Sequence, residues 1–118
     1  MTLITDADRN KLLANGREAA AGADIDPFPV VKIFVPDGNA TWLLSELNPA
    51  DPDVAYGLAD LGKGMPELGY VVLGEIAQLR GCVGLPAERD RFFRATAPLS
   101  VYASAAFAAG SIINPTTV

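Results

Sequence analysis

The chain has 118 residues, of which half are apolar and 19% are charged, with a formal net charge of -5 and no histidine. Enough apolar surface is present to offset the entropy of ordering, so a disordered chain is excluded and one domain over residues 1–118 is expected. With no histidine and a single cysteine, the chain lacks the residues for Ser-His-Asp or Cys-His catalysis, for the usual structural zinc sites and for an internal disulfide, and we expect no cofactor.

A helix is predicted over residues 6–15. Thr5 followed three residues later by Asp8 resembles a capping box with a shorter acid, and the dipeptide Asn15-Gly16 offers a stop signal. The glycine and prolines of the next stretch, REAAAGADIDPFP, then predict a connector.

A β-hairpin over residues 30–47 is the clearest local pattern. The segments VVKIFV and TWLLSEL are rich in β-branched and apolar residues, and PDGN between them favours a turn at Asp37-Gly38. A turn at this position makes one face wholly apolar and the other face half polar. The predicted pairs are Val35 with Ala40, Ile33 with Trp42 and Val31 with Leu44 on the first face, and Phe34 with Thr41, Lys32 with Leu43 and Val30 with Ser45 on the second.

Five further elements follow the loop NPADPD. Alternating side chains predict strands near residues 54–59 and 69–73, and the segment GEIAQLRG predicts a short helix near 74–80. RFFRAT predicts a fifth strand near 91–96, and the alanine-rich LSVYASAAFAA predicts a helix near 99–109. The apolar face of this last helix would combine Leu99, Tyr102, Ala106 and Phe107.

Strands joined by short turns, with helices before and after them, predict an α+β fold. We expect an antiparallel β-meander of four to five strands, with the helices packed mainly on one face. Trp42, Tyr56 and Tyr70 are interpreted as core residues of this fold, because a buried aromatic ring is commoner than a ligand platform. Cys82 is interpreted as a half-buried small apolar side chain.

Acidic residues concentrate in the middle of the chain, where residues 37–75 contain seven acids and one base, Lys63. The simplest interpretation is that these acids are solvated turn residues, because turns recruit aspartate for backbone reasons. Alternatively, a face of one charge sign attracts a basic partner. The candidate binding residues in this part of the chain are Glu46, Asp60 and Glu67.

The segment GLPAERDRFFR, residues 84–94, places five charges around two phenylalanines. An edge strand that keeps its charges outward to prevent unwanted pairing explains this pattern. Alternatively, arginines beside aromatic rings suit a carboxylate or phosphate group of a partner. The candidate binding residues here are Glu88, Arg89, Asp90, Arg91 and Arg94.

Several blocks of the sequence resemble a bacterial family, domain of unknown function 2958. These blocks are VVKIFV, TWLLSEL, DPDVAYGLADLG, ELGYVVLGEIAQLRG and LPAERD, and the resemblance covers residues 28–102. The family often has a histidine where this chain has Phe92. The resemblance implies a small bacterial protein of the kind encoded on plasmids and integrated mobile elements, and it implies no activity and no catalytic residue.

Charge and hydropathy also bear on location and partners. The longest apolar tract, VYASAAFAAGSII, is shorter than the ~20 residues that a membrane-spanning helix needs. The acidic start MTLITDADRN is unlike a signal peptide. We therefore expect a cytoplasmic protein without membrane contact. The negative net charge disfavours nucleic acid as a partner. A homo-oligomer is compatible with the sequence.

Three functions are compatible with these residues. The leading hypothesis is a non-enzymatic accessory module that binds a protein partner through the acidic meander or the arginine-rich segment. The first alternative is an enzyme acting on a small or nucleic-acid substrate, which requires two carboxylates to converge. The second alternative is an acidic DNA mimic that inhibits a restriction protein, although seven acids give a much lower density of negative charge than a phosphate backbone.

Overall fold

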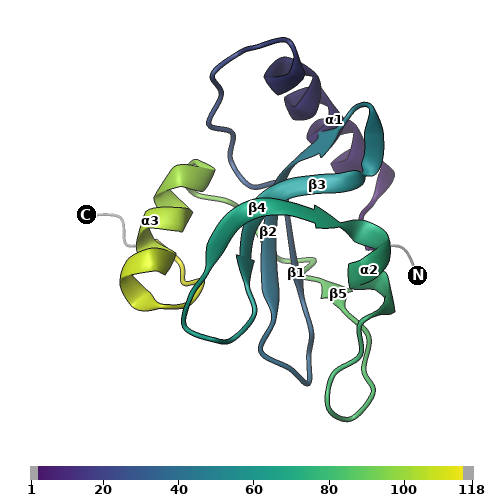
Figure 1. The fold of residues 1–118 in the computed structure, drawn as a ribbon, viewed down its shortest axis with the longest axis vertical. Coiled ribbons are helices and arrows are strands. Elements are labelled where there is room, and N and C mark those ends of the chain that lie inside the picture. Colours follow the sequence, from purple (N-terminus) through teal and green to yellow (C-terminus); the bar gives the residue numbers. More distant parts are fainter. Residues whose placement is uncertain (1–2, 116–118) are drawn as a thin grey trace.

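The computed structural model describes residues 3–115, which form three helices and one five-stranded antiparallel sheet (Figure 1). The fold is therefore α+β, as predicted. The strand order is β4-β3-β2-β1-β5. In chain order the elements are α1 (Asp6–Ala20), β1 (Val31–Phe34), β2 (Thr41–Asn48), β3 (Asp51–Asp60), β4 (Glu67–Val72), α2 (Leu73–Gln78), β5 (Glu88–Arg89) and α3 (Leu99–Ala109).

The predicted hairpin forms with the predicted register, in which Ile33 lies opposite Trp42 and Val31 opposite Leu44. The turn itself differs from the prediction, because the Gly38 N–H donates to the Val35 carbonyl at 3.0 Å and so places residues 36 and 37 at the turn centre. The register survives this change because residues 36–39 form a four-residue loop that is symmetric about the predicted centre.

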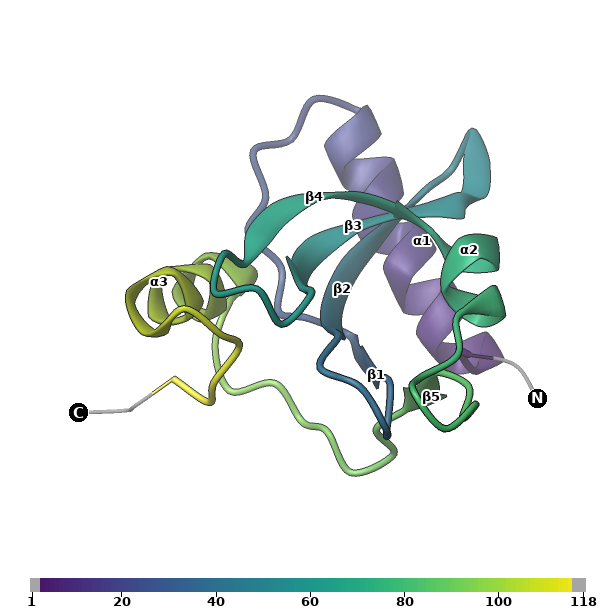
Figure 2. The same cartoon turned by 60° about the horizontal axis from the view of Figure 1, so that its bottom comes forward.

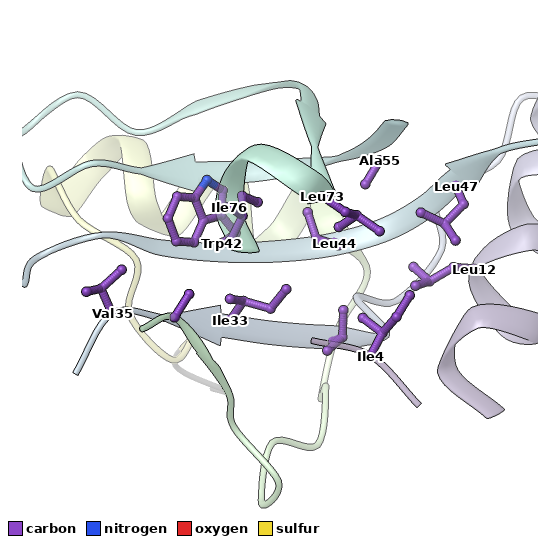
Figure 3. Close-up of a cluster of buried hydrophobic side chains, with 12 residues drawn as sticks. Ile4, Leu12, Ile33, Val35, Trp42, Leu44, Leu47, Ala55, Leu73 and Ile76 are labelled. Carbon is purple, nitrogen blue, oxygen red and sulfur yellow. The ribbon is translucent and has the colours of Figure 1, made fainter. Parts of the chain in front are cut away.

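The sheet buries side chains on both of its faces. On one face, α1 and α2 cover a cluster that we call the Trp42 core, shown in Figure 3. On the other face, α3 covers Leu43 and Leu58, so two of the three helices share a face and the third lies opposite them (Figure 2). The Trp42 core consists of Ile4, Leu12, Val31, Ile33, Val35, Trp42, Leu44, Leu47, Ala55, Leu73, Ile76 and Ala87.

Helix α1 does not stop at Asn15-Gly16 but continues to Ala20. Gly16 is buried where α1 crosses β2, and a Cβ atom at this position would collide with the Leu47 carbonyl oxygen. The glycine therefore permits a close contact between helix and strand instead of ending the helix. The Asn15 side-chain amide reinforces this contact by donating to the Ser45 carbonyl oxygen at 2.9 Å.

The fifth strand is Glu88–Arg89, paired with β1, and not a strand near residues 91–96. A turn at Asp90 explains the difference. The Asp90 carboxylate accepts from the Phe92 N–H at 2.9 Å, and the Asp90 carbonyl accepts from the Phe93 N–H at 3.3 Å. The backbone donors that would have extended the strand are therefore used locally.

Helix α3 has the predicted limits, and a distant segment fixes its first turn. The Asp26 carboxylate accepts from the Ser100 N–H at 3.1 Å and also from the Ser100 hydroxyl. Leu99, Tyr102 and Ala106 are buried as predicted, but Phe107 is exposed. At its C-terminus the helix ends on Gly110, whose φ of 78° is the left-handed conformation that glycine adopts at no steric cost.

The interpretation of the aromatic residues and of Cys82 holds only in part. Trp42 is buried in the core, and Tyr56 is half-buried. Tyr70, in contrast, is 73% exposed, because β4 is an edge strand and its side chains lack a covering layer on one side. Cys82 is exposed and lies in the loop after α2, where its thiol donates to the Asp37 carbonyl at 3.1 Å.

Candidate functional site

The predicted site residues fall in three separate parts of the molecule. Asp60 and Glu67 lie at the β3–β4 connection, Glu46 lies in the second half of β2, and the charged segment 88–94 lies beside β1 and the first turn of α1. The two groups that line cavities are therefore described separately.

Asp60 has a structural environment. Its side chain is 6% exposed, and each carboxylate oxygen accepts one backbone N–H. The donors are Gly62 and Ile112, each at 2.9 Å, so this carboxylate fastens the segment after α3 to the end of β3. Glu67 is exposed at the start of β4, opposite Ala59. Neither acid lines the two cavities described below.

The first cavity, which we call the arginine hollow, has a volume of about 230 Å³. It lies between the first turn of α1, the start of β1 and the turn after β5. Thr5 lines the hollow at the start of α1. Its hydroxyl caps α1 by accepting from the Asp8 N–H at 3.0 Å, as predicted. The lining residues are Thr5, Asp8, Val30, Val31, Arg89, Asp90, Arg91, Phe93 and Arg94.

The turn at Asp90 brings the arginines to the hollow. Arg89 is the last residue of β5, and Arg91 and Arg94 follow within and beyond the turn. Arg94 donates to the Phe93 carbonyl at 2.8 Å, while Phe92 points into solvent with 85% of its surface exposed. Glu88 lies half-buried opposite Phe34 and is not part of the lining.

A β-bulge in β2 builds the second cavity. Leu44 pairs with Gly57 and Glu46 pairs with Tyr56, so Ser45 is an extra residue on its strand. In a regular strand Leu44 and Glu46 would share one face. The bulge instead returns Leu47 to the Trp42 core and places Glu46 beside Tyr56 on a different side of the sheet.

The second cavity, which we call the tyrosine cavity, has a volume of about 240 Å³. Three of its residues come from the C-terminal half of α1, and three come from the end of β2 and the turn after it. The other three occupy paired positions, one on each of the neighbouring strands β2, β3 and β4. The rings of Tyr56 and Tyr70 meet edge to face, with centroids 5.1 Å apart. The lining residues are Gly16, Ala19, Ala20, Glu46, Leu47, Asn48, Pro49, Tyr56 and Tyr70.

Two side chains of the tyrosine cavity have altered acidity. Burial raises the pKa of the Glu46 carboxyl above its usual value, and no other group contributes to this change. Burial also raises the pKa of the Tyr56 phenol, with smaller contributions from Tyr70 and from the charge of Glu46. Tyr56 therefore stays a neutral phenol at physiological pH, and the ionised form of Glu46 lacks part of its hydration.

Sequence reasoning identified Glu46 and the arginines but missed the two tyrosines. One signal for the bulge was present in TWLLSEL, because the apolar alternation of Trp42 and Leu44 resumes at Leu47 and not at the polar position 46. Such a break in alternation is the sequence form of a bulge. With the bulge in place, the pairing of Tyr56 with Glu46 follows from the strand register.

Few acidic side chains line the two cavities. Glu46 is the only carboxylate in the tyrosine cavity, and the acids of the arginine hollow are Asp8 and Asp90. Among residues 3–115, no group of three or more histidine, cysteine or acidic side chains is placed to hold a metal ion. Across the same residues, no helix combines the length and the apolar character needed to cross a membrane.

Comparison with known families gives one match. The sequence model of a family described as protein of unknown function (DUF2958) matches residues 3–113. Comparison with curated proteins and comparison with solved structures found no match. The family match extends over nearly the whole chain, well beyond the blocks that carry the resemblance, and the protein belongs to the DUF2958 family.

Proposed function

We propose that this protein is a non-enzymatic accessory module that binds an acidic group of a protein partner in the arginine hollow. The convergence of Arg89, Arg91 and Arg94 on one cavity carries this proposal. A guanidinium group donates two parallel hydrogen bonds to a carboxylate, which gives both orientation and affinity. Phe92 follows Arg91 in the chain and is exposed, and an exposed aromatic residue next to arginines is the composition of an interface hot spot.

The charge of the hollow favours a carboxylate over a nucleic-acid backbone. Asp8 and Asp90 offset two of the three arginines, so the lining carries an excess of about one positive charge. The whole chain has a net charge of -5, which repels a polyanion. One carboxylate on a partner surface matches this excess, whereas a run of phosphates does not.

The family context guides where to look for the partner. The sequence blocks resemble proteins encoded on plasmids and integrated mobile elements, near genes for replication, partition, transfer or antirestriction. We therefore place the partner among the proteins of such an element, in the bacterial cytoplasm.

The two alternative functions have less support. A carboxylate enzyme needs two acids that converge on one site, and of Glu46, Asp60, Glu67 and Glu88 only Glu46 lines either cavity. Asp8 and Asp90 share the arginine hollow with three arginines, which favours the ionised form of both acids over the mixed pair that acid–base catalysis requires. A DNA mimic needs acids that face outward in series, but the carboxylates of Asp37 and Asp60 accept hydrogen bonds from backbone N–H groups.

Affinity capture followed by a direct binding measurement tests the proposal. The full chain and an Arg91→Ala/Arg94→Ala variant are used as baits in host lysate, and a protein retained only by the wild type is purified and titrated by calorimetry. We expect the variant to bind at least about tenfold more weakly, as is usual for hot-spot arginines.

The matched control is an Arg17→Ala/Lys63→Ala variant, which loses the same charge at two exposed positions outside the hollow. If the two double variants lose the same affinity relative to wild type, the loss is due to net charge and the hollow is not the binding site. A second check reverses charges, because an Arg91→Glu variant should regain affinity when the partner's contacting acid is changed to arginine.

A further inference from the structure

The tyrosine cavity lies beside the other half of α1 and has the opposite chemistry from the arginine hollow. Asp8 lines the hollow and Ala19 lines the cavity, which puts about 16 Å of helix between them at 1.5 Å per residue. Glu46 supplies the one charged group of the cavity, and the two tyrosine rings supply its aromatic surface. Carboxylate and aromatic rings together are the groups that recognise an organic cation.

We propose that the tyrosine cavity binds the basic side chain of a lysine or arginine residue from a protein partner. The Glu46 carboxylate pairs with the cationic head group, and Tyr70, which is largely exposed, offers its ring to the same group. Gly16, Ala19 and Ala20 present small apolar surfaces along which the methylene stem of a basic side chain can lie.

The size of the cavity selects a single side chain. Its volume of about 240 Å³ is below the range of roughly 300–1,000 Å³ that is typical of pockets for drug-sized molecules. A peptide backbone therefore stays outside while one side chain enters. The small residues of α1 matter for this fit, since a larger side chain at position 19 or 20 would fill the space.

The electrostatics of Glu46 favour a cation as the occupant. Burial alone raises the pKa of this carboxyl, which means that its charge lacks part of its hydration. A bound cation replaces the missing hydration, so cation binding and ionisation of Glu46 favour each other. Tyr56 and Tyr70 are the other side chains of the lining with an ionisable group, and burial keeps the Tyr56 phenol neutral by raising its pKa.

This inference goes beyond the proposed function and does not depend on it. The two cavities share no lining residue, and their ligands have opposite charge. A failure of one binding site therefore leaves the other intact, and the two can be tested on the same preparation.

Titration with small probes tests the cation site. Nα-acetyl-lysine methylamide and its arginine counterpart are added to the 15N-labelled full chain, and amide shifts are followed by NMR. Nα-acetyl-norleucine methylamide, which has the lysine stem without the charge, is the control ligand. We expect saturable shifts at Glu46, Tyr56 and Tyr70 with at least one cationic probe, at dissociation constants of about 1–10 mM, and no saturation with norleucine.

Three variants locate the effect. Glu46→Gln keeps the size of the side chain and should weaken binding about tenfold, whereas Glu67→Gln removes the same charge outside the cavity and should leave binding unchanged. Ala20→Leu, at an exposed position of α1, should block the cavity without altering any charge. The 15N spectrum of each variant reports whether it is folded.

Two results would overturn the proposal. One is the absence of saturable shifts in the cavity with either cationic probe up to about 50 mM, well above the dissociation constant expected for such a contact. The other is equal affinity of Glu46→Gln, Glu67→Gln and wild type, which would show that the probe binds elsewhere.

Discussion

Carboxylates at the two ends of the sheet have different surroundings. At the end with the β1–β2 and β3–β4 loops, the lower end in Figure 1, Asp37 and Asp60 accept hydrogen bonds from backbone N–H groups of distant segments. One Asp37 oxygen holds the loop after α2 through Val83 at 2.7 Å and Leu85 at 3.2 Å. Near α1, by contrast, Glu46 lines a cavity and its charge is disfavoured by burial.

This contrast separates acids that hold the fold from an acid available to a ligand. A carboxylate that accepts backbone N–H groups stabilises the chain, because removing it leaves those donors without a partner. A half-buried carboxylate without such compensation lowers stability when it ionises. The four predictions that follow test whether the two ends of the sheet differ in this way, from the largest expected effect to the smallest.

The largest effect is expected for Asp60→Ala. This change removes two hydrogen bonds to a buried carboxylate, with Gly62 and with Ile112, and should lower the free energy of unfolding by about 3 kcal/mol. Urea unfolding followed by tryptophan fluorescence measures it. Asp60→Asn should recover part of the loss, because an amide oxygen still accepts one of the two bonds. A loss below about 0.5 kcal/mol would contradict the structural role of Asp60.

Asp37→Ala should lower the free energy of unfolding by about 1–2 kcal/mol, less than Asp60→Ala because Asp37 is only half-buried. The effect should be local as well. Amide hydrogen exchange at Val83 and Leu85 should accelerate far more than exchange in β2. Uniform acceleration over the whole chain would indicate that the loop and the sheet unfold together. The matched control is Asp24→Ala, at an exposed position.

Glu46→Gln should not destabilise the protein at neutral pH, in contrast to both aspartates. A carboxyl whose pKa is raised on folding favours the folded state below its unfolded pKa, near 4.5, and that advantage is lost as pH rises through the raised pKa. Wild type should therefore lose stability relative to Glu46→Gln between pH 4.5 and neutrality. Urea unfolding at a series of pH values checks the sign, and a difference that grows in the opposite direction would contradict the burial of this charge.

Arg91→Ala and Phe92→Ala should have the smallest effect on stability. Both side chains are exposed, so each variant should keep its free energy of unfolding within about 0.5 kcal/mol of wild type. Thermal unfolding by calorimetry measures it. A larger loss would mean that the turn after β5 supports the fold, and the hydrogen bond of Asp90 with Phe92 would be the first contact to examine.

The sequence predicted the elements whose local and long-range signals agree. In the hairpin, turn residues and side-chain alternation specify one register, and Ile33 lies opposite Trp42 as predicted. Where the signals conflict, the structure departs from the prediction. Gly16 reads locally as a helix stop, but its lack of a side chain serves the contact with β2. Asp90 ends a strand that the alternation of charged and aromatic residues would extend.

The candidate site was predictable only where its residues are neighbours in the sequence. Arg89, Arg91 and Arg94 could be grouped because they are close along the chain, but the contribution of Thr5 and Asp8 to the same hollow depends on how α1 lies on the sheet. The tyrosine cavity depends further on a single extra residue in β2. Both cavities are therefore products of packing, which periodicity alone does not specify.

The position of α3 has a consequence for how the protein is made. Leu43 and Leu58 lie under α3, which follows every strand of the sheet in chain order. During translation the strands emerge first, at about 5–20 residues per second, and this face of the sheet lacks its cover until α3 has left the ribosome. The nascent chain thus passes through a stage with an exposed apolar sheet face. Chaperones can bind this face, and neighbouring nascent chains can associate through it.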